Sequence, residues 1–222
     1  MKLRILFCTA AAGLLLAGIY AAGMRGLADA EYYPARRAMT QWSAAKRPPS
    51  AVALDAAQAS LERAAALAPS NPLYVEELGR LYEMRALPLP LPASRPLLEQ
   101  SRAQFRRAAA LRPGSPYAWS NLALVKYRLG EMDFEFYGAL DRAARFGPWE
   151  PAVQLALADI GLASWRWLAL PGKLTVLGAI ERGMLRQGKE IDRLAGLHPS
   201  SKAFCADPLV RARRLPVHCA AV

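Results

Sequence analysis

Small and apolar residues recur at helical spacing along most of the chain, and three segments repeat nearly the same pattern: Leu61–Pro72, Phe105–Pro116 and Leu140–Pro151. Each segment contains alanines that allow neighbouring helices to approach closely, and then a proline that ends a helix. A second proline, three residues later, suits the first turn of the next helix. This alternation predicts pairs of helices stacked in series, each packing against its neighbours. We therefore expect an all-α solenoid rather than one globular enzyme core.

The residues after each pair of prolines resemble the tetratricopeptide repeat family. In that family a large residue, a leucine, a small residue and an aromatic share one face of the first helix of each repeat. The corresponding residues of the best copy are Val75, Leu78, Gly79 and Tyr82. The second copy has Lys126 at the aromatic position, and the third has Gly161 there. The resemblance implies a tetratricopeptide-like solenoid whose repeats diverge towards the C-terminus.

A leucine–proline segment lengthens the first full repeat. Leucine and proline alternate from Leu87 to Pro92, and Pro96 follows closely. Because proline fixes φ and lacks an N–H donor, we predict an extended, polyproline-like insertion between the two helices of that repeat.

The chain begins with an apolar run. Lys2 and Arg4 precede Ile5–Met24, which contains no charged residue, and Arg25 follows. A helix of about twenty apolar residues spans the hydrocarbon core of a bilayer. A short basic N-terminus before one apolar run is typical of a signal anchor that leaves the N-terminus in the cytoplasm. The alternative is a signal peptide cleaved near Ala28-Asp29-Ala30.

These features divide the chain into five parts. We expect a transmembrane helix at 1–26, a juxtamembrane segment at 27–50, repeats at 51–168 with the insertion at 87–96, capping helices at 169–198 and a basic tail at 199–222. The helices expected outside the two fuller repeats are Tyr32–Lys46, Leu54–Leu67, Glu150–Leu168, Thr175–Gly188 and Lys189–Leu197. Among these, Leu54–Leu67 would be the second helix of an incomplete leading repeat. Beyond Pro199 we expect irregular structure.

Two of the cysteines, Cys205 and Cys219, lie in the tail. In an oxidising compartment they would form a disulfide, and closing a loop of this size stabilises a protein by about 3 kcal/mol. Free thiols are one alternative. A metal site that adds His198 and His218 is another, although no Cys-x-x-Cys spacing supports it.

The formal net charge of +11 gathers around the second repeat. The residues of this expected basic face are Arg102, Arg106, Arg107, Arg112 and Arg128, with Arg95 and Lys126 nearby. Such a face can attract anionic lipid headgroups, acidic polysaccharide or an acidic protein. Alternatively, it is a solvated face whose arginine stems cover apolar surface. An exported, membrane-anchored chain makes nucleic acid an unlikely partner.

Motifs for catalysis are missing from the sequence. It contains no glycine-rich phosphate loop, paired-histidine metal motif or Gly-x-Ser-x-Gly elbow, so we expect neither an enzyme nor a bound cofactor or metal. The acidic clusters Glu76-Glu77 and Glu131-x-Asp133-x-Glu135 are expected to face water. In the apolar stretch Val153–Ile180, Trp165 and Trp167 are expected to pack the last repeat against the next helix; the alternative is a membrane interface.

Two longer runs, Arg112–Leu124 and Leu140–Leu162, resemble the VpsP-type proteins of bacterial exopolysaccharide clusters. That resemblance implies a single-pass protein of the bacterial inner membrane whose repeat domain lies in the periplasm. It also implies a non-enzymatic accessory role in the synthesis or export of a surface polysaccharide, through inner-membrane or periplasmic partner proteins.

The leading hypothesis is therefore a membrane scaffold that recognises a partner. The first helices of successive repeats would form a concave surface, on which the candidate contacts are Tyr82, Asn121, Lys126 and Tyr127. Two other classes remain open: direct binding of an anionic polysaccharide or lipid by the basic face, and general assembly of an envelope complex.

Overall fold

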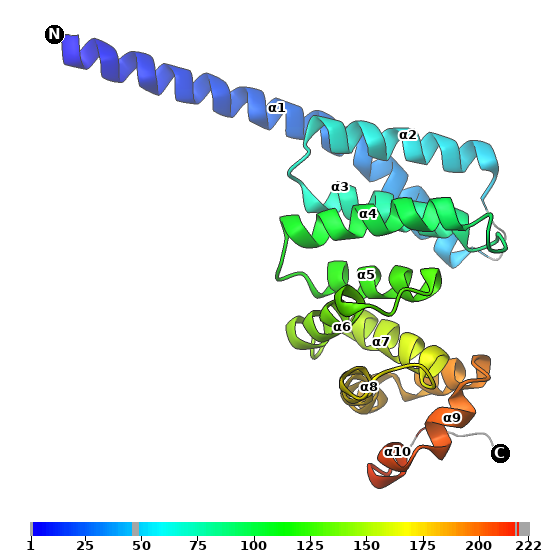
Figure 1. Cartoon of the computed structure of the whole chain (residues 1–222). Coiled ribbons are helices and arrows are strands. Elements are labelled where there is room, and N and C mark those ends of the chain that lie inside the picture. The colour runs from blue at the N-terminus through cyan, green and yellow to red at the C-terminus, as the bar shows by residue number, and fades with distance from the viewer. Residues whose placement is uncertain (1, 46–48, 216, 218–222) are drawn as a thin grey trace.

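A computed structural model describes residues 2–45, 49–215 and 217, and in this part of the chain the regular structure is entirely helical (Figure 1). The helices are α1 (Lys2–Ala44), α2 (Ala51–Leu67), α3 (Pro72–Ala86), α4 (Arg95–Leu111), α5 (Pro116–Leu129), α6 (Phe134–Phe146), α7 (Pro151–Ser164), α8 (Leu170–Leu197), α9 (Ser201–Ala206) and α10 (Pro208–Ala212). From α1 to α8, helices consecutive in the chain pack against one another; α5 also contacts α7, α6 contacts α8, and α9 packs on α7 and α10. The predicted all-α solenoid with a long apolar helix at its start is confirmed.

The proline punctuation acts as the sequence predicts. Pro72, Pro116 and Pro151 each occupy the first turn of a helix. Asn71 and Ser115, just before two of these prolines, accept hydrogen bonds from backbone N–H groups of the first turn. Each cap satisfies a donor that the helix itself leaves unpaired, so the helix boundaries follow from local sequence.

Helix α1 has two different halves. Its first half is long and apolar enough to cross a membrane and is not buried by the rest of the protein. Its second half packs on α2 through Ala28, Tyr32, Ala35 and Met39, which lie three or four residues apart and are buried. The helix is continuous between the halves, so the expected boundary between 1–26 and 27–50 is not a break. The second half of α1 thus supplies the first helix of the leading repeat.

The leucine–proline insertion does not form the extended segment predicted. Residues 87–94 fold into consecutive turns, with backbone hydrogen bonds from Leu89 N to Ala86 O at 3.0 Å and from Ser94 N to Pro90 O at 3.1 Å. Ser94 itself is buried. The N–H groups of Leu89 and Ser94, which proline cannot supply, close the turns and keep the loop compact.

The C-terminal region has the predicted break in its long helix and a tail that is more regular than the sequence suggested. Helix α8 is kinked by non-helical backbone at Gln187, so the two helices predicted on either side of Gly188 are present as two segments that meet one residue earlier. The tail contains the short helices α9 and α10 instead of irregular structure alone. Phe204 of α9 is fully buried and meets Trp165 edge-on at 4.8 Å between ring centroids, so apolar packing holds the start of the tail on the last repeat.

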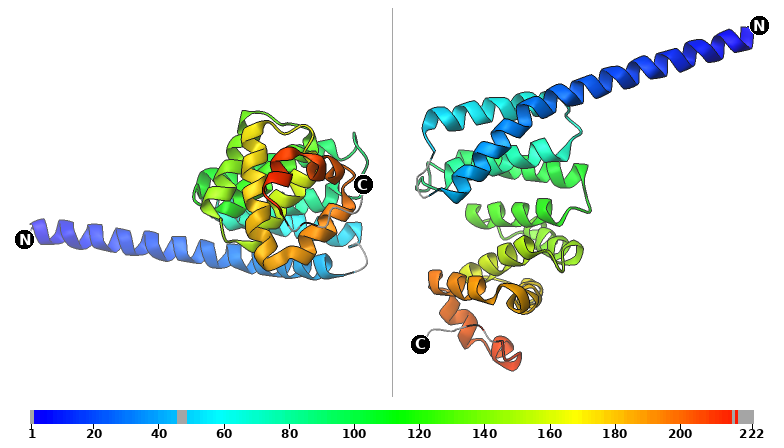
Figure 2. Two further views of the ribbon diagram at one scale, coloured as in Figure 1. Left: turned by 90° about the horizontal axis from the view of Figure 1, so that it is seen from below. Right: turned by 180° about the vertical axis from the view of Figure 1, so that it is seen from behind.

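The stack has two edges. The loops at 68–71 and 112–115 lie on the side from which the exposed half of α1 protrudes, which we call the proximal edge (Figure 2). Loop 147–150 belongs to the same edge, since Tyr117 at the start of α5 donates a hydrogen bond to Glu150. The loop at 87–94 lies on the opposite side, the distal edge, with loop 130–133 beside it.

Candidate interaction surfaces

Lys126, predicted to contact a partner, is instead buried among acidic side chains. Its side chain is only 2% exposed. Its Nζ atom lies 3.1 Å from a Glu131 oxygen, 2.9 Å from an Asp133 oxygen and 2.8 Å from a Glu135 oxygen. Lys126 lies on the core face of the repeat, so the apolar stem of its side chain packs in the core. Its ammonium group reaches the three carboxylates near the start of α6. Lys126 is therefore not available to a partner.

Arginines of α4 complete this cluster. Arg102 forms an ion pair with Glu131, and Arg106 makes two hydrogen bonds of 2.6 Å to Glu135. The cluster comprises three cations, Lys126, Arg102 and Arg106, and three carboxylates, Glu131, Asp133 and Glu135. The acidic cluster therefore does not simply face water, as predicted, but joins α4, α5 and α6 in a network of balanced charge.

The pKa values of the cluster reflect these contacts. The hydrogen bond from Arg106 and, after it, the one from Lys126 lower the pKa of Glu135 to about 2, against the opposing effect of burial. Burial alone would lower the pKa of Lys126, but its hydrogen bonds to the three carboxylates raise it. The charged forms of both groups are thus stabilised in the folded protein.

The remaining residues of the predicted basic face are also largely engaged. Arg128 forms an ion pair with Glu83, and Arg107 donates a hydrogen bond to the Pro69 carbonyl oxygen at 2.8 Å. Arg112 is exposed. Because Arg102, Arg106 and Arg128 are paired with carboxylates on neighbouring helices, the predicted face is not a continuous positive surface.

Nor do Tyr82, Asn121 and Tyr127 form one groove. Tyr82 is buried, and its hydroxyl lies 3.1 Å from Glu62. Asn121 is partly exposed and donates a hydrogen bond of 3.3 Å to Glu76 of α3. Asn121 and Tyr127 point about 120° apart around α5, because an α-helix has about 3.6 residues per turn. Tyr127 lines a recess of the surface.

That recess, which we call the Leu-Pro pocket, has a volume of about 430 Å³. It lies between the loop at 87–94 and the C-terminal end of α5, at the distal edge. Its lining residues are Ala86, Leu87, Leu89, Leu91, Ser94, Leu98, Tyr127, Arg128, Leu129 and Gly130. Leu87, Leu89 and Leu91 are all exposed, and Gly130 ends α5 with φ of 77°, a left-handed conformation that favours glycine. The pocket therefore combines a largely apolar wall with the tyrosine ring and the Arg128–Glu83 ion pair.

The C-terminal candidates have other neighbours. Cys205 is disulfide-bonded, but Cys219 and His218 lie outside the described residues, so their pairing with it stays a prediction. His198 lies 2.6 Å from Asp159 through its Nε2 atom. Within the described part of the chain, no group of three or more acidic, histidine or cysteine side chains is placed to hold a metal ion.

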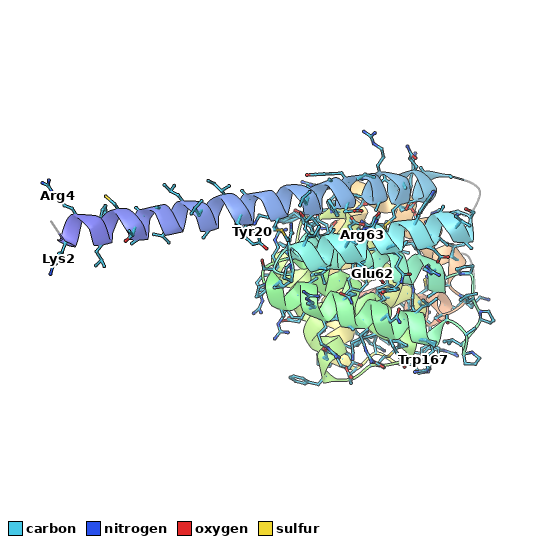
Figure 3. All side chains as sticks on the ribbon, turned by 90° about the horizontal axis from the view of Figure 1, so that it is seen from above. Lys2, Arg4, Tyr20, Glu62, Arg63 and Trp167 are labelled. Atoms are coloured by element: carbon cyan, nitrogen blue, oxygen red, sulfur yellow. The ribbon has the colours of Figure 1, made fainter. Side chains whose placement is uncertain are left out.

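The two tryptophans of the apolar stretch differ. Trp165 is buried, as predicted, and its indole N–H donates a hydrogen bond of 2.9 Å to Asp207. Trp167, in contrast to the prediction, is 64% exposed and lies on the side of the stack away from the first half of α1 (Figure 3). Another exposed aromatic, Phe134, begins α6 just after loop 130–133 at the distal edge.

Comparison with known proteins adds no relative: no protein-family model matches the chain, and no curated protein does. The sequence did contain a signal for the ion-pair cluster, namely a lysine at a core position of the repeat followed closely by three acids. It contained no comparable signal for the Leu-Pro pocket, which depends on how the loop folds back over α5.

Proposed function

We propose that this chain is a non-enzymatic, membrane-anchored scaffold that binds a protein partner through the Leu-Pro pocket. The observation that carries the proposal is an exposed apolar recess at the distal edge, the side of the stack opposite the one from which the apolar half of α1 protrudes. Exposed leucines lining a concavity are typical of a surface that another protein covers. An apolar side chain of the partner would enter beside Tyr127, and the leucines of the loop would close around it.

The setting we propose is the bacterial inner membrane, with the N-terminus in the cytoplasm and the tetratricopeptide-like stack in the periplasm. The charge-free run Ile5–Met24 of α1, preceded by Lys2 and Arg4, supports this orientation. The disulfide at Cys205 supports an oxidising compartment. The resemblance to VpsP-type proteins makes the machinery for exopolysaccharide synthesis or export the first place to look for the partner.

Direct binding of an anionic polysaccharide by the basic face is less well supported. Its arginines already neutralise Glu131, Glu135 and Glu83, so polymer binding would have to break these pairs. A general role in envelope assembly would use the same pocket and differs only in the partner.

We predict that Leu89→Ser combined with Leu91→Ser abolishes capture of the partner while leaving the stack folded. Both side chains are exposed, so their removal takes apolar surface from the partner and not from the core. A photo-crosslinking residue at Leu87 would be used in the native host, with and without the two substitutions, and the adducts identified by mass spectrometry. Leu197→Ser is the control, because Leu197 is about as exposed as Leu87 and lies outside the pocket.

An adduct with a polymerase, glycosyltransferase or chain-length regulator, lost in the double variant and kept in Leu197→Ser, supports the scaffold. Adducts with unrelated envelope proteins favour a general assembly role. If both variants lose or both keep the adduct, the pocket is not the binding site.

A further inference from the structure

The proximal edge exposes a row of large apolar side chains. Its members lie in the three loops of this edge or at the helix ends beside them, and they are Leu73, Leu111, Tyr117, Phe146 and Trp149. Trp149 is the most exposed of them, at 58%. Each repeat contributes to the row, so it follows the edge of the stack and is not a single loose loop.

This edge lies level with the end of the membrane-spanning run. Asp29 accepts a hydrogen bond of 2.7 Å from the hydroxyl of Tyr74, which lies in the first turn of α3. Asp29 is five residues beyond Met24, about 7.5 Å along a helix that rises 1.5 Å per residue. The headgroup region on each side of a bilayer is about 5–7 Å thick. The start of α3, with Leu73, therefore reaches the headgroups if α1 spans the membrane.

No linker holds the stack away from that surface. Helix α1 continues from the apolar run into the packed region, and Arg63 of α2 makes two hydrogen bonds of 2.9 Å to Glu31. The helix and the edge are thus parts of one packed unit, and inserting the first half of α1 brings the whole edge towards the bilayer (Figures 1 and 2).

Close contacts join the loops of this edge to each other. A methyl group on Gly147 would lie 2.6 Å from a side-chain carbon of Pro116, so the two loops pack with no spare room. Tyr117 hydrogen-bonds to Glu150, and Arg107 to the Pro69 carbonyl oxygen. The apolar row is therefore presented as one fixed surface.

The chemistry of the row suits a lipid surface. Tryptophan and tyrosine favour the level of the headgroups, where the ring is apolar and its polar atom stays hydrated. Two exposed cations, Arg112 and Arg145, accompany the row, and the guanidinium of Arg145 lies 5.2 Å from the centre of the Phe146 ring. Cations next to a membrane are attracted to anionic headgroups.

We propose that the proximal edge of the solenoid rests in the headgroup layer of the membrane that α1 spans and contacts anionic phospholipid. The inference rests on the proposed anchoring by α1. It fixes the stack against the bilayer, with the Leu-Pro pocket on the side that faces away. Arg112 is the member of the predicted basic face that contributes to it, whereas Arg102, Arg106 and Arg128 are paired with carboxylates.

The test uses the full chain in vesicles of phosphatidylcholine and phosphatidylglycerol, three parts to one, with and without phosphatidylcholine brominated near the top of its acyl chains. Bromine quenches tryptophan fluorescence at short range. Comparing the wild type with Trp149→Phe isolates the emission of Trp149. The matched control, Trp167→Phe, isolates an equally exposed tryptophan on the opposite side of the stack (Figure 3).

We expect brominated lipid to quench the emission of Trp149, measured as the difference between the wild type and Trp149→Phe. The emission of Trp167, measured in the same way with Trp167→Phe, should not change. Quenching of Trp149 should weaken in the variant Arg112→Ser with Arg145→Ser, or when phosphatidylglycerol is omitted. Two results would overturn the proposal: equal quenching of both tryptophans, or no quenching of Trp149 in protein that floats with the vesicles. The apolar row would then be a candidate surface for a protein partner. Protein that does not float with the vesicles would overturn the anchoring as well.

Discussion

Replacing Gly161 with alanine should lower the free energy of unfolding by about 2–3 kcal/mol, the cost of inserting a methyl group into a tightly packed core. A methyl group at this position would lie 1.9 Å from a γ-carbon of Val176 on α8. Val176 is buried and branched at its β-carbon, so it cannot move aside at low cost. Urea denaturation of the detergent-solubilised protein, followed by far-UV circular dichroism, measures the loss.

Two further variants separate overpacking from a general effect of alanine. Gly138 is also helical, but the nearest atom to its added methyl would be 3.9 Å away on Arg142. Gly138→Ala should therefore be neutral or stabilising by up to about 1 kcal/mol, the difference in helix propensity. In a Val176→Ala background the space is vacated, and Gly161→Ala should cost little. An equal cost in both backgrounds would show that the contact is not the cause.

Gly161 illustrates what the repeat pattern could and could not tell. The pattern located the helix and marked this position as a departure from the tetratricopeptide-like consensus, because an aromatic was expected. The structure gives the physical reason: α7 and α8 approach so closely that Val176 fills the space an aromatic would need. The spacing of the stack sets this distance, and nothing local to α7 encodes it.

Local signals predicted the boundaries of the helices well. Prolines in the first turn and polar caps before them act within a few residues, so they can be read from sequence directly. The continuity of α1 is not among the predictions, because Lys46-Arg47-Pro48-Pro49 indicates only where a later break lies. The sign of continuity is the helical spacing of Ala28, Tyr32, Ala35 and Met39, which the structure buries. The path of the leucine–proline loop depends on contacts with α5, which are distant in sequence.

The partners of charged residues cannot be read from the local sequence. Arg102, Arg106 and Arg128 lie close together in the sequence, and this proximity predicts a binding face. Their partners come from neighbouring helices, with Glu131 and Glu135 near the start of α6 and Glu83 on α3. A cluster of arginines in a solenoid is therefore weak evidence for a ligand until its acidic neighbours across the stack are known.

Replacing Lys126 with methionine should have the largest effect on stability, a loss of about 3 kcal/mol at neutral pH. Removing one member of a buried ion pair costs about 3–5 kcal/mol, and the partial exposure of the three carboxylates moves the expected value to the lower end. Methionine keeps the apolar stem of the side chain, so the variant removes the charge and little packing. Arg193→Met is the control: it removes a cation from an exposed pair with Glu190 and should change stability by no measurable amount.

The dependence of this loss on pH identifies its cause. Glu135 has its pKa lowered to about 2 in the folded protein, so its pairing stabilises the fold fully above its pKa in the unfolded chain, about 4.3. That stabilisation is lost as the pH falls from there towards 2. Without Lys126 the carboxylates should take up protons at higher pH. The difference in the free energy of unfolding between Lys126→Met and the wild type should therefore shrink below about pH 4.5. A difference in the free energy of unfolding that stays constant from pH 7 to pH 3 would instead assign the loss to packing. Partner capture by the folded Lys126→Met variant should match the wild type, because a buried cation that links three helices has no surface to offer a partner.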